Sequence, residues 1–499
     1  MNRSAGILLS VSSLPSKYGI GCFDESAYSF IDWLKSAGQE YWQILPLGPI
    51  SYGDSPYQSF STFAGNPYYI SLDEFIENGL LTSRECTAPY FLINDGRIDY
   101  HNLYKTRIPL LKKAYKNSGG SYEKEIEGFS RENKWLYDYA LFMALKDKNE
   151  GKPFTEWEEG IRLRNPSELE KNKNILSKET GFYKFIQYFF FKQWYKLKKY
   201  ANESGIKIIG DIPIYVAADS VDVWSNPELF KLDKSGKPTA VAGCPPDSFS
   251  ETGQLWGNPL YDWKKHKEGG FKWWISRIEH CFKLYDVVRI DHFRGFDEYY
   301  SIPAEDKTAE NGHWEKGAGI ELFQALENVI GKREIIAEDL GFVTESVKKL
   351  VSDCGFPNMK VLQFGFDSRD TGSRNDYLPH NYGENSVAYT GTHDNQTLSS
   401  WFKTISEEER REAREYMCDM YTPDYKLNKA FISLIFRSRS RLCVIPMQDW
   451  LGLSDESRMN TPSTIGNNWR WRMKSTDMSE KLAKEIKKIT VTYGRKENI

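Results

Sequence analysis

Four acidic side chains lie at or just after the ends of short, strongly apolar segments of the sequence: Asp211, Asp291, Glu338 and Asp394. Arg289 precedes Asp291 by two residues, so both side chains should point to the same side of an extended strand. Acids that gather in one place repel one another, and that cost requires a chemical reason or a bound cation. Together they form a candidate catalytic site, although each acid alone could equally be a helix cap or half of a salt bridge.

The pattern suits the cleavage of a glycosidic bond by two carboxyl groups. An arginine beside Asp291 favours the ionised form that a nucleophile requires. Acidic neighbours would help Glu338 to keep the proton that a general acid must donate at neutral pH. Retaining glycoside cleavage uses carboxyl groups about 5–5.5 Å apart, a separation that adjacent strands can supply.

Two histidines follow these acids in the sequence. We expect His393 to bind a sugar hydroxyl beside Asp394, with a buried structural histidine as the alternative. His292 receives no firm role, because its side chain should alternate away from that of Asp291.

Eight short apolar segments predict the strands that carry these residues, with helical patterns between most of them. The segments are 7–11, 41–46, 207–211, 286–291, 334–338, 360–366, 386–390 and 441–446. Such continuously apolar strands are typical of a parallel sheet covered by helices. We therefore predict an α/β fold, a (β/α)₈ TIM barrel whose C-terminal strand ends open on one face. An open doubly wound sheet is the alternative, but no G-x-G-x-x-G follows the first segment.

The connection between the second and third strands, at about 50–185, is too long for one crossover. We expect it to form an inserted helical subdomain beside the barrel mouth. Smaller insertions, also expected to be mostly helical, follow the third and fourth strands at about 217–265 and 295–318. The prediction for 1–499 is one catalytic barrel domain without a C-terminal β-domain.

Composition excludes several classes of protein. The net charge of −3 offers no attraction to nucleic acid or to an anionic membrane. The seven cysteines include no C-x-x-C pair, which argues against disulfides or a zinc site and favours a cytoplasmic location. The apolar run at 5–14 superficially resembles a signal peptide, but it carries three serines and lacks a cleavage site. No apolar run approaches the roughly 18 residues of a membrane span.

Longer motifs surround the candidate residues and resemble those of the amylomaltase, or disproportionating-enzyme, family of the α-amylase clan. The resemblance extends from residue 5 to about 473. Its motifs are DSPYQSFS at 54–61, FAGNP at 63–67, GDIPIYV at 210–216, PPDSFS at 245–250, TGQLWGNP at 252–259, RIDHFRG at 289–295, EDLG at 338–341, THD at 392–394 and NWRWR at 468–472.

The resemblance implies a retaining 4-α-glucanotransferase that moves α-1,4-glucan segments between maltooligosaccharides, or to glucose, without a cofactor or a metal. Asp291 would be the nucleophile, Glu338 the acid and then the base, and Asp394 the stabiliser of the distorted sugar. The remaining residues would bind substrate or orient the site: Tyr57, Asp211, Trp256, Arg289 and His393. One departure is Ser463, which stands where the family's pattern has glycine, and the region at about 85–180 carries no matching motif.

The carboxyl groups alone do not distinguish transfer from hydrolysis, because both proceed through the same glycosyl-enzyme. A transferase must bind acceptor sugars and exclude water, and the loops at 55–57 and 245–259, with Phe249 and Trp256, suit that task. An α-glucan hydrolase is the main alternative. A metal-dependent barrel enzyme, which EDTA would inhibit, and a glucan-binding protein without catalysis are the others. The sequence makes no prediction of the oligomeric state.

Overall fold

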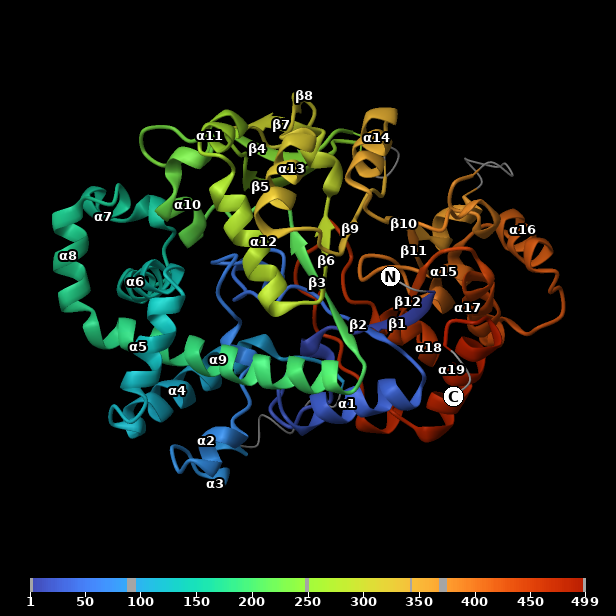
Figure 1. Ribbon diagram of the computed structural model, residues 1–499, viewed down its shortest axis with the longest axis horizontal. Coiled ribbons are helices and arrows are strands. Elements are labelled where there is room, and N and C mark those ends of the chain that lie inside the picture. The colour runs from blue at the N-terminus through green and yellow to red at the C-terminus, as the bar shows by residue number, and fades with distance from the viewer. Residues whose placement is uncertain (1–2, 88–95, 247–250, 342, 368–374, 497–499) are drawn as a thin grey trace.

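The computed structural model describes residues 3–87, 96–246, 251–341, 343–367 and 375–496. At its centre lies a closed barrel of parallel strands in the order β1-β12-β11-β10-β9-β6-β3-β2, which confirms the predicted fold (Figure 1). Its strands are β1 (Ser4–Leu8), β2 (Tyr41–Gln43), β3 (Lys207–Pro213), β6 (Val287–Asp291), β9 (Ile335–Ala337), β10 (Asn358–Val361), β11 (Ser386–Tyr389) and β12 (Leu442–Pro446).

Helices between the strands cover the barrel, and their ends follow ordinary capping rules. In the first of them, the Asp24 carboxylate caps the N-terminus by accepting from the Ser26 N–H at 3.0 Å. The helix of residues Glu345–Cys354 is capped by Thr344 at its N-terminus and by Gly355 at its C-terminus. The φ of Gly355, 69°, is the left-handed conformation that glycine tolerates. The helices outside the large insertion are α1 (Glu25–Ser36), α10 (Val221–Ser225), α11 (Trp263–Glu268), α12 (Lys272–Leu284), α13 (Gly319–Ile330), α14 (Glu345–Cys354), α15 (Leu398–Thr404), α16 (Glu407–Met417), α17 (Leu427–Arg437), α18 (Met447–Leu451) and α19 (Glu480–Thr492).

The long connection after β2 is helical, as predicted, and lies to one side of the barrel, opposite α15–α17 (Figure 1). Its elements are α2 (Asp73–Glu77), α3 (Ser83–Cys86), α4 (Tyr100–Ser118), α5 (Glu123–Glu132), α6 (Trp135–Lys148), α7 (Glu159–Arg162), α8 (Pro166–Ile175) and α9 (Ser177–Glu203). Helix α9 contacts both α6 of the insertion and β3 of the barrel, so it joins the two regions.

The two smaller insertions differ from the mostly helical prediction. They pair with each other in an antiparallel sheet of order β5-β4-β7-β8, formed by β4 (Ala240–Cys244), β5 (Gln254–Pro259), β7 (Glu298–Pro303) and β8 (His313–Lys316). A small buried cluster of Val241, Tyr300, Ile302 and Ala309 packs within it. The partners β4 and β7 lie far apart in the sequence, so no local pattern revealed their pairing.

The limits of the predicted strands differ in the structure, and in two places a 3₁₀ segment replaces part of a predicted strand. The first strand begins and ends three residues earlier than the predicted 7–11, and Val11–Ser13 form a 3₁₀ turn instead. The sixth ends at Val361, and Leu362–Phe366 continue as 3₁₀ helix η8 rather than as strand. An apolar run shows that a segment is buried but does not distinguish a strand from a tight helical turn.

A continuous cluster of buried side chains extends from the barrel into the helical insertion. The buried Arg495 donates to the carbonyl of Ser4 at 3.1 Å, so the two ends of the described chain meet beside β1. All seven cysteines are described, and no disulfide joins any two of them. Over the ranges that the structure describes, no helix combines the length and the apolarity needed to cross a lipid bilayer.

Candidate active site

A cleft of about 1490 Å³ opens at the C-terminal ends of the barrel strands. Its wall includes Asp291, Glu338 and Asp394, the three predicted catalytic acids. Drug-sized ligands occupy pockets of roughly 300–1,000 Å³, so this cleft has room for an extended ligand. The structure thus brings together acids from three separate segments of the sequence, at the face where barrel enzymes carry their sites.

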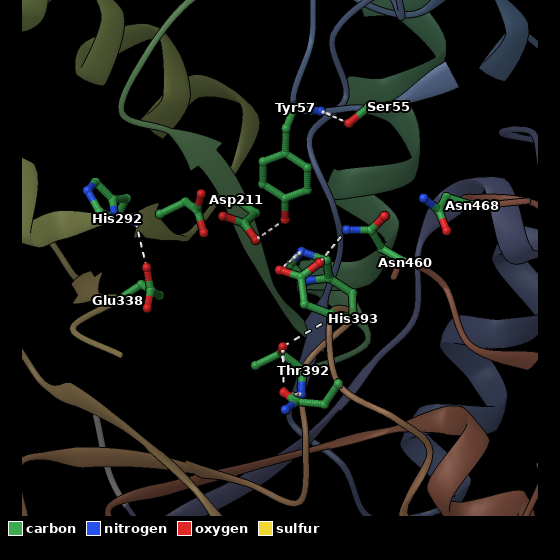
Figure 2. Close-up of polar contacts among 12 residues, drawn as sticks. Ser55, Tyr57, Asp211, His292, Glu338, Thr392, His393, Asn460 and Asn468 are labelled. Atoms are coloured by element: carbon green, nitrogen blue, oxygen red, sulfur yellow. Dashed lines mark hydrogen bonds and ion pairs between the residues drawn. The ribbon is translucent and has the colours of Figure 1, made fainter. Parts of the chain in front are cut away.

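A series of polar contacts connects Asp291 with side chains deeper in the barrel. The Arg289 guanidinium lies 3.0 Å from Asp291 Oδ1 and 2.7 Å from both carboxylate oxygens of Asp211. Arg289 and Asp291 therefore do share one side of their strand. Asp211 is fully buried beside Arg289 in the register of β3 and β6, one layer deeper than Asp291. Its second partner is the Tyr57 hydroxyl, which donates to Oδ2 at 2.8 Å (Figure 2).

Glu338 is held by the backbone of the strand ends. Its Oε2 accepts from the His292 N–H at 2.6 Å (Figure 2), and its Oε1 accepts from the Leu340 N–H at 2.8 Å. Only 9 % of this residue is exposed, against 28 % of the Asp291 side chain. Glu338 is thus the more enclosed of the two facing acids.

Burial separates the proton affinities of the two acids. Burial, and then the charge of Asp291, raises the pKa of Glu338 to about 8. Burial also raises the pKa of Asp291, to about 6, but Arg289 opposes this rise. Arg289 alone was expected to keep the pKa of Asp291 low, and acidic neighbours to raise that of Glu338. Desolvation is the larger cause in both. Glu338 remains the acid that keeps its proton to higher pH.

Asp394 lies in the loop after β11, with 42 % of its side chain exposed to the cleft. Its Oδ1 accepts from the Asn460 side-chain amide at 2.6 Å, and its Oδ2 lies 3.3 Å from His393 Nε2. Arg458 donates to the Asp394 carbonyl at 2.5 Å. The carboxylate is therefore oriented on both sides, yet open towards the cleft.

Aromatic rings line the same cleft. Tyr57 stacks on His393 with ring centroids 5.1 Å apart, and Trp469 lies 5.8 Å from each of them. On the other side, the Trp256 indole N–H donates to Gln254 Oε1 at 3.0 Å, which orients the ring. Rings with one apolar face and one polar edge are suited to contacts with sugars. Phe249, predicted in the same loop as Trp256, lies outside the described residues.

Comparison with known proteins identifies the family of this fold and site. The family model described as 4-alpha-glucanotransferase matches residues 9–478. The chain belongs to the 4-alpha-glucanotransferase family. The 4-alpha-glucanotransferase of Clostridium butyricum is 50% identical over 97% of this chain and 99% of its own, and that of Thermus thermophilus 46% over 96% of each.

Solved structures of this family agree with the fold. The amylomaltase of Streptococcus agalactiae, solved in complex with acarbose, superposes with a TM-score of 0.96 at 42% identity, covering 99% of this chain and 100% of that one. The amylomaltase of Corynebacterium glutamicum shares the fold with a TM-score of 0.77 at 17% identity, covering 99% of this chain and 75% of that one.

The chain carries a strained turn at Ser463, where its sequence departs from the family's pattern. The Thr464 N–H donates to the Thr461 carbonyl at 3.2 Å, with Pro462 and Ser463 between them. Ser463 has a φ of 63°. Proline followed by a residue of positive φ defines a type II turn, whose third position favours glycine. The turn therefore keeps the geometry of a glycine loop although serine occupies it, and it lines the cleft.

Some residues of the site were not predicted from the sequence. Asn460 and Arg458 reach Asp394 from a segment that follows the last barrel strand, and no spacing connects them with Thr392–Asp394. Their neighbour Trp469 stood in a recognised motif, NWRWR at 468–472, but received no role. Within the described part of the chain, no three histidine, cysteine or carboxylate side chains are grouped so as to hold a metal ion.

Proposed function

We propose that this chain is a retaining 4-α-glucanotransferase whose nucleophile is Asp291 and whose acid, and then base, is Glu338. The observation that supports it most is the contrast between these two acids. Asp291 touches a buried arginine, whereas Glu338 is enclosed and faces the charge of Asp291. At neutral pH one carboxyl group is then ionised for attack and the other protonated for the leaving oxygen.

The reaction follows from these roles in two steps. In the first, an Asp291 oxygen bonds to the anomeric carbon of an α-1,4-linked glucose while Glu338 protonates the departing glycosidic oxygen. In the second, Glu338 takes a proton from a hydroxyl of the acceptor sugar, which displaces Asp291 and restores the α-linkage. Asp394 would bind hydroxyls of the reacting sugar, oriented by Asn460 and His393.

Arg289, Asp211 and Tyr57 act together in this proposal. Burial, and then the charge of Asp211, holds the pKa of Tyr57 well above its ordinary value, so the phenol stays a donor. Arg289 compensates the charge of Asp211, and the Tyr57 hydroxyl donates a hydrogen bond to the same carboxylate. Arg289 also holds Asp291. Asp211 is fully buried, so it would serve substrate binding by fixing Tyr57 and Arg289 rather than by touching the sugar.

We further propose that donors and acceptors are α-1,4-glucans and maltooligosaccharides, with glucose also serving as an acceptor. The volume of the cleft and its aromatic walls, Trp256 and Tyr57 among them, support this substrate class. We assign all 499 residues to one catalytic domain. Seven cysteines without a disulfide among them, all of them described, support a cytoplasmic location.

Incubation with maltotriose alone tests this function. A transferase should form glucose together with maltooligosaccharides longer than the substrate, while total reducing ends stay nearly constant, because each bond broken is replaced. Chromatography of the products and a reducing-sugar assay measure both quantities. A steady rise in reducing ends without longer products would instead identify a hydrolase.

A further inference from the structure

His292 follows Asp291 and has a backbone conformation that histidine seldom adopts. Its φ of 54° and ψ of 47° lie in the left-handed region. This region is uncommon for residues other than glycine; asparagine, aspartate and histidine are the types found there most often, whereas a β-branched residue is an outlier. Strained residues of this kind persist where the surrounding structure holds them, and they gather at functional sites.

The left-handed turn directs consecutive backbone groups at Glu338. The His292 N–H donates to the Glu338 carboxylate at 2.6 Å, and the next N–H, of Phe293, donates to the Glu338 carbonyl at 2.9 Å. On the other side of the turn, the Glu338 N–H donates to the Ile290 carbonyl at 3.1 Å. Backbone groups of the segment that carries Asp291 therefore bind both the main chain and the side chain of Glu338.

The His292 ring is packed so that it can hold this conformation. It meets Trp256 edge-to-face, with ring centroids 4.8 Å apart, and lies 6.3 Å from the Tyr215 ring. A Cβ atom at Gly295 would come within 3.3 Å of the imidazole, so glycine there leaves room for the ring. Burial lowers the pKa of His292 to about 3, which keeps the ring uncharged beside these aromatic residues at neutral pH.

We propose that His292 is a positioning residue for the proton donor: its left-handed backbone aims its own N–H at the Glu338 carboxylate, and its ring, wedged against Trp256, keeps the backbone in place. The inference rests on the proposed role of Glu338 as the acid. It adds that the residue next to the nucleophile sets the place and the proton affinity of that acid.

The effect on proton affinity has a definite sign. A backbone N–H stabilises the ionised form of Glu338, so this contact opposes the rise in pKa that burial and Asp291 cause. Arg289 acts in the same direction as the N–H, and Tyr377 also faces Glu338. The other titratable groups of the site act on the pKa of Asp291: Asp211, Asp394 and His393. Loss of the His292 contact should therefore raise the pKa of Glu338.

Two substitutions separate the backbone from the ring. His292→Asn and His292→Val both remove the imidazole, but asparagine tolerates the left-handed region and valine does not. With maltotriose, the alkaline limb of kcat/KM reports the ionisation of the acid in the free enzyme. We expect His292→Asn to keep this limb near that of the unmodified enzyme. His292→Val should move it upward by about one pH unit, as loss of one charge-stabilising hydrogen bond would.

A fluoride donor distinguishes positioning from general damage. Fluoride needs little protonation to leave, so formation of the glycosyl-enzyme from α-glucosyl fluoride should differ little between the two variants, whereas kcat for maltotriose should be at least about tenfold lower in His292→Val. If His292→Val does not fold, His292→Ala replaces it, since alanine also disfavours the left-handed region.

The positioning role would be overturned if the alkaline limb of kcat/KM fell at the same pH in His292→Asn and His292→Val. It would also be overturned if His292→Val lost as much activity with α-glucosyl fluoride as with maltotriose. Failure of the unmodified enzyme to produce the ladder of longer products would instead overturn the proposed function. The two failures are therefore distinguishable.

Discussion

Asp291 and Glu338 face one cleft but meet different surroundings. Arg289, with 3 % of its side chain exposed, lies between Asp211 and Asp291 and compensates both carboxylates. Within the described residues no cationic side chain contacts Glu338, which accepts from two backbone N–H groups. A buried charge without an opposite charge is costly, so Glu338 is the acid that stays protonated.

The plot of activity against pH should therefore be bell-shaped. Transfer needs Asp291 ionised and Glu338 protonated, so activity falls in acid as Asp291 gains a proton and falls in alkali as Glu338 loses one. With the pKa of Asp291 raised to about 6 and that of Glu338 to about 8, the optimum should lie near neutrality. Initial rates with maltotriose across this range measure it. Because the two acids interact, the apparent pKa values of the two limbs belong to the pair of acids together. A rate that rises steadily into alkali would contradict the assignment.

Residues of the site differed in how far the sequence could predict them. The two-residue spacing of Arg289 and Asp291 places both on one side of a strand, and strand ends of a parallel barrel share one face, so their meeting followed from local rules. Asn460 could not be predicted, because its contact with Asp394 depends on the path of a long loop. The extent of desolvation also depends on the folded cleft, so its dominance over charge was not visible beforehand.

Among the local elements, the turn of Thr461–Thr464 carries strain that a side-chain clamp offsets. The Asn468 side chain accepts from the Thr461 N–H at 3.0 Å and donates to the Thr464 carbonyl at 2.9 Å, so it ties both ends of the turn together. Ser463 itself is exposed and lies in the left-handed region. The clamp explains how serine keeps a geometry that glycine would adopt freely.

Replacing this serine should stabilise the turn. Ser463→Gly removes the strain of a left-handed side chain but adds backbone entropy to the unfolded chain, for a net gain of roughly 0.5–1 kcal/mol. Ser463→Val, whose branched side chain fits this region poorly, should destabilise by a similar or larger amount. Urea unfolding of both variants measures the difference. A lower midpoint for Ser463→Gly than for the unmodified protein would show that the hydroxyl matters more than the strain.

Elements whose partners are adjacent in a βα repeat were predictable, whereas long-range pairs were not. The barrel strands are continuous apolar runs that alternate with helices, and this alternation can be recognised from short stretches of the sequence. In the sheet beside the barrel, β4 pairs with β5 of the same insertion and with β7 of the other insertion. Residues 298–303 include Tyr299, Tyr300 and Ile302, types that favour strands, but only the folded chain shows their partner.

On the scale of the whole molecule, one buried arginine joins the end of the described chain to the beginning of the barrel. The Arg495 guanidinium donates to the carbonyls of Ser4, Phe436, Ser438 and Ser440, and no part of the residue is exposed. These carbonyls belong to β1, to the end of α17 and to the segment between α17 and β12. The contacts therefore hold the neighbouring first and last barrel strands beside α19.

Loss of this arginine should weaken the fold without altering the chemistry. Arg495→Met keeps much of the side-chain volume but leaves buried carbonyls without a donor, which should cost about 2–4 kcal/mol of unfolding free energy. Arg439→Ala is the matched control, because that arginine is 72% exposed in a surface pair with Glu384 and should change little. Urea unfolding measures both, and equal midpoints would contradict the role given to Arg495.

The division of labour between Asp291 and Glu338 is tested most directly by trapping the glycosyl-enzyme. Glu338→Gln should react with α-glucosyl fluoride, whose leaving group needs little protonation, and then stall because the second step lacks its base. Mass spectrometry of the intact protein should show one added glucosyl group, and peptide digestion should place it on Asp291. Asp291→Asn should form no adduct. An adduct on Asp291→Asn, or one mapped to position 338 in the unmodified chain, would contradict the account.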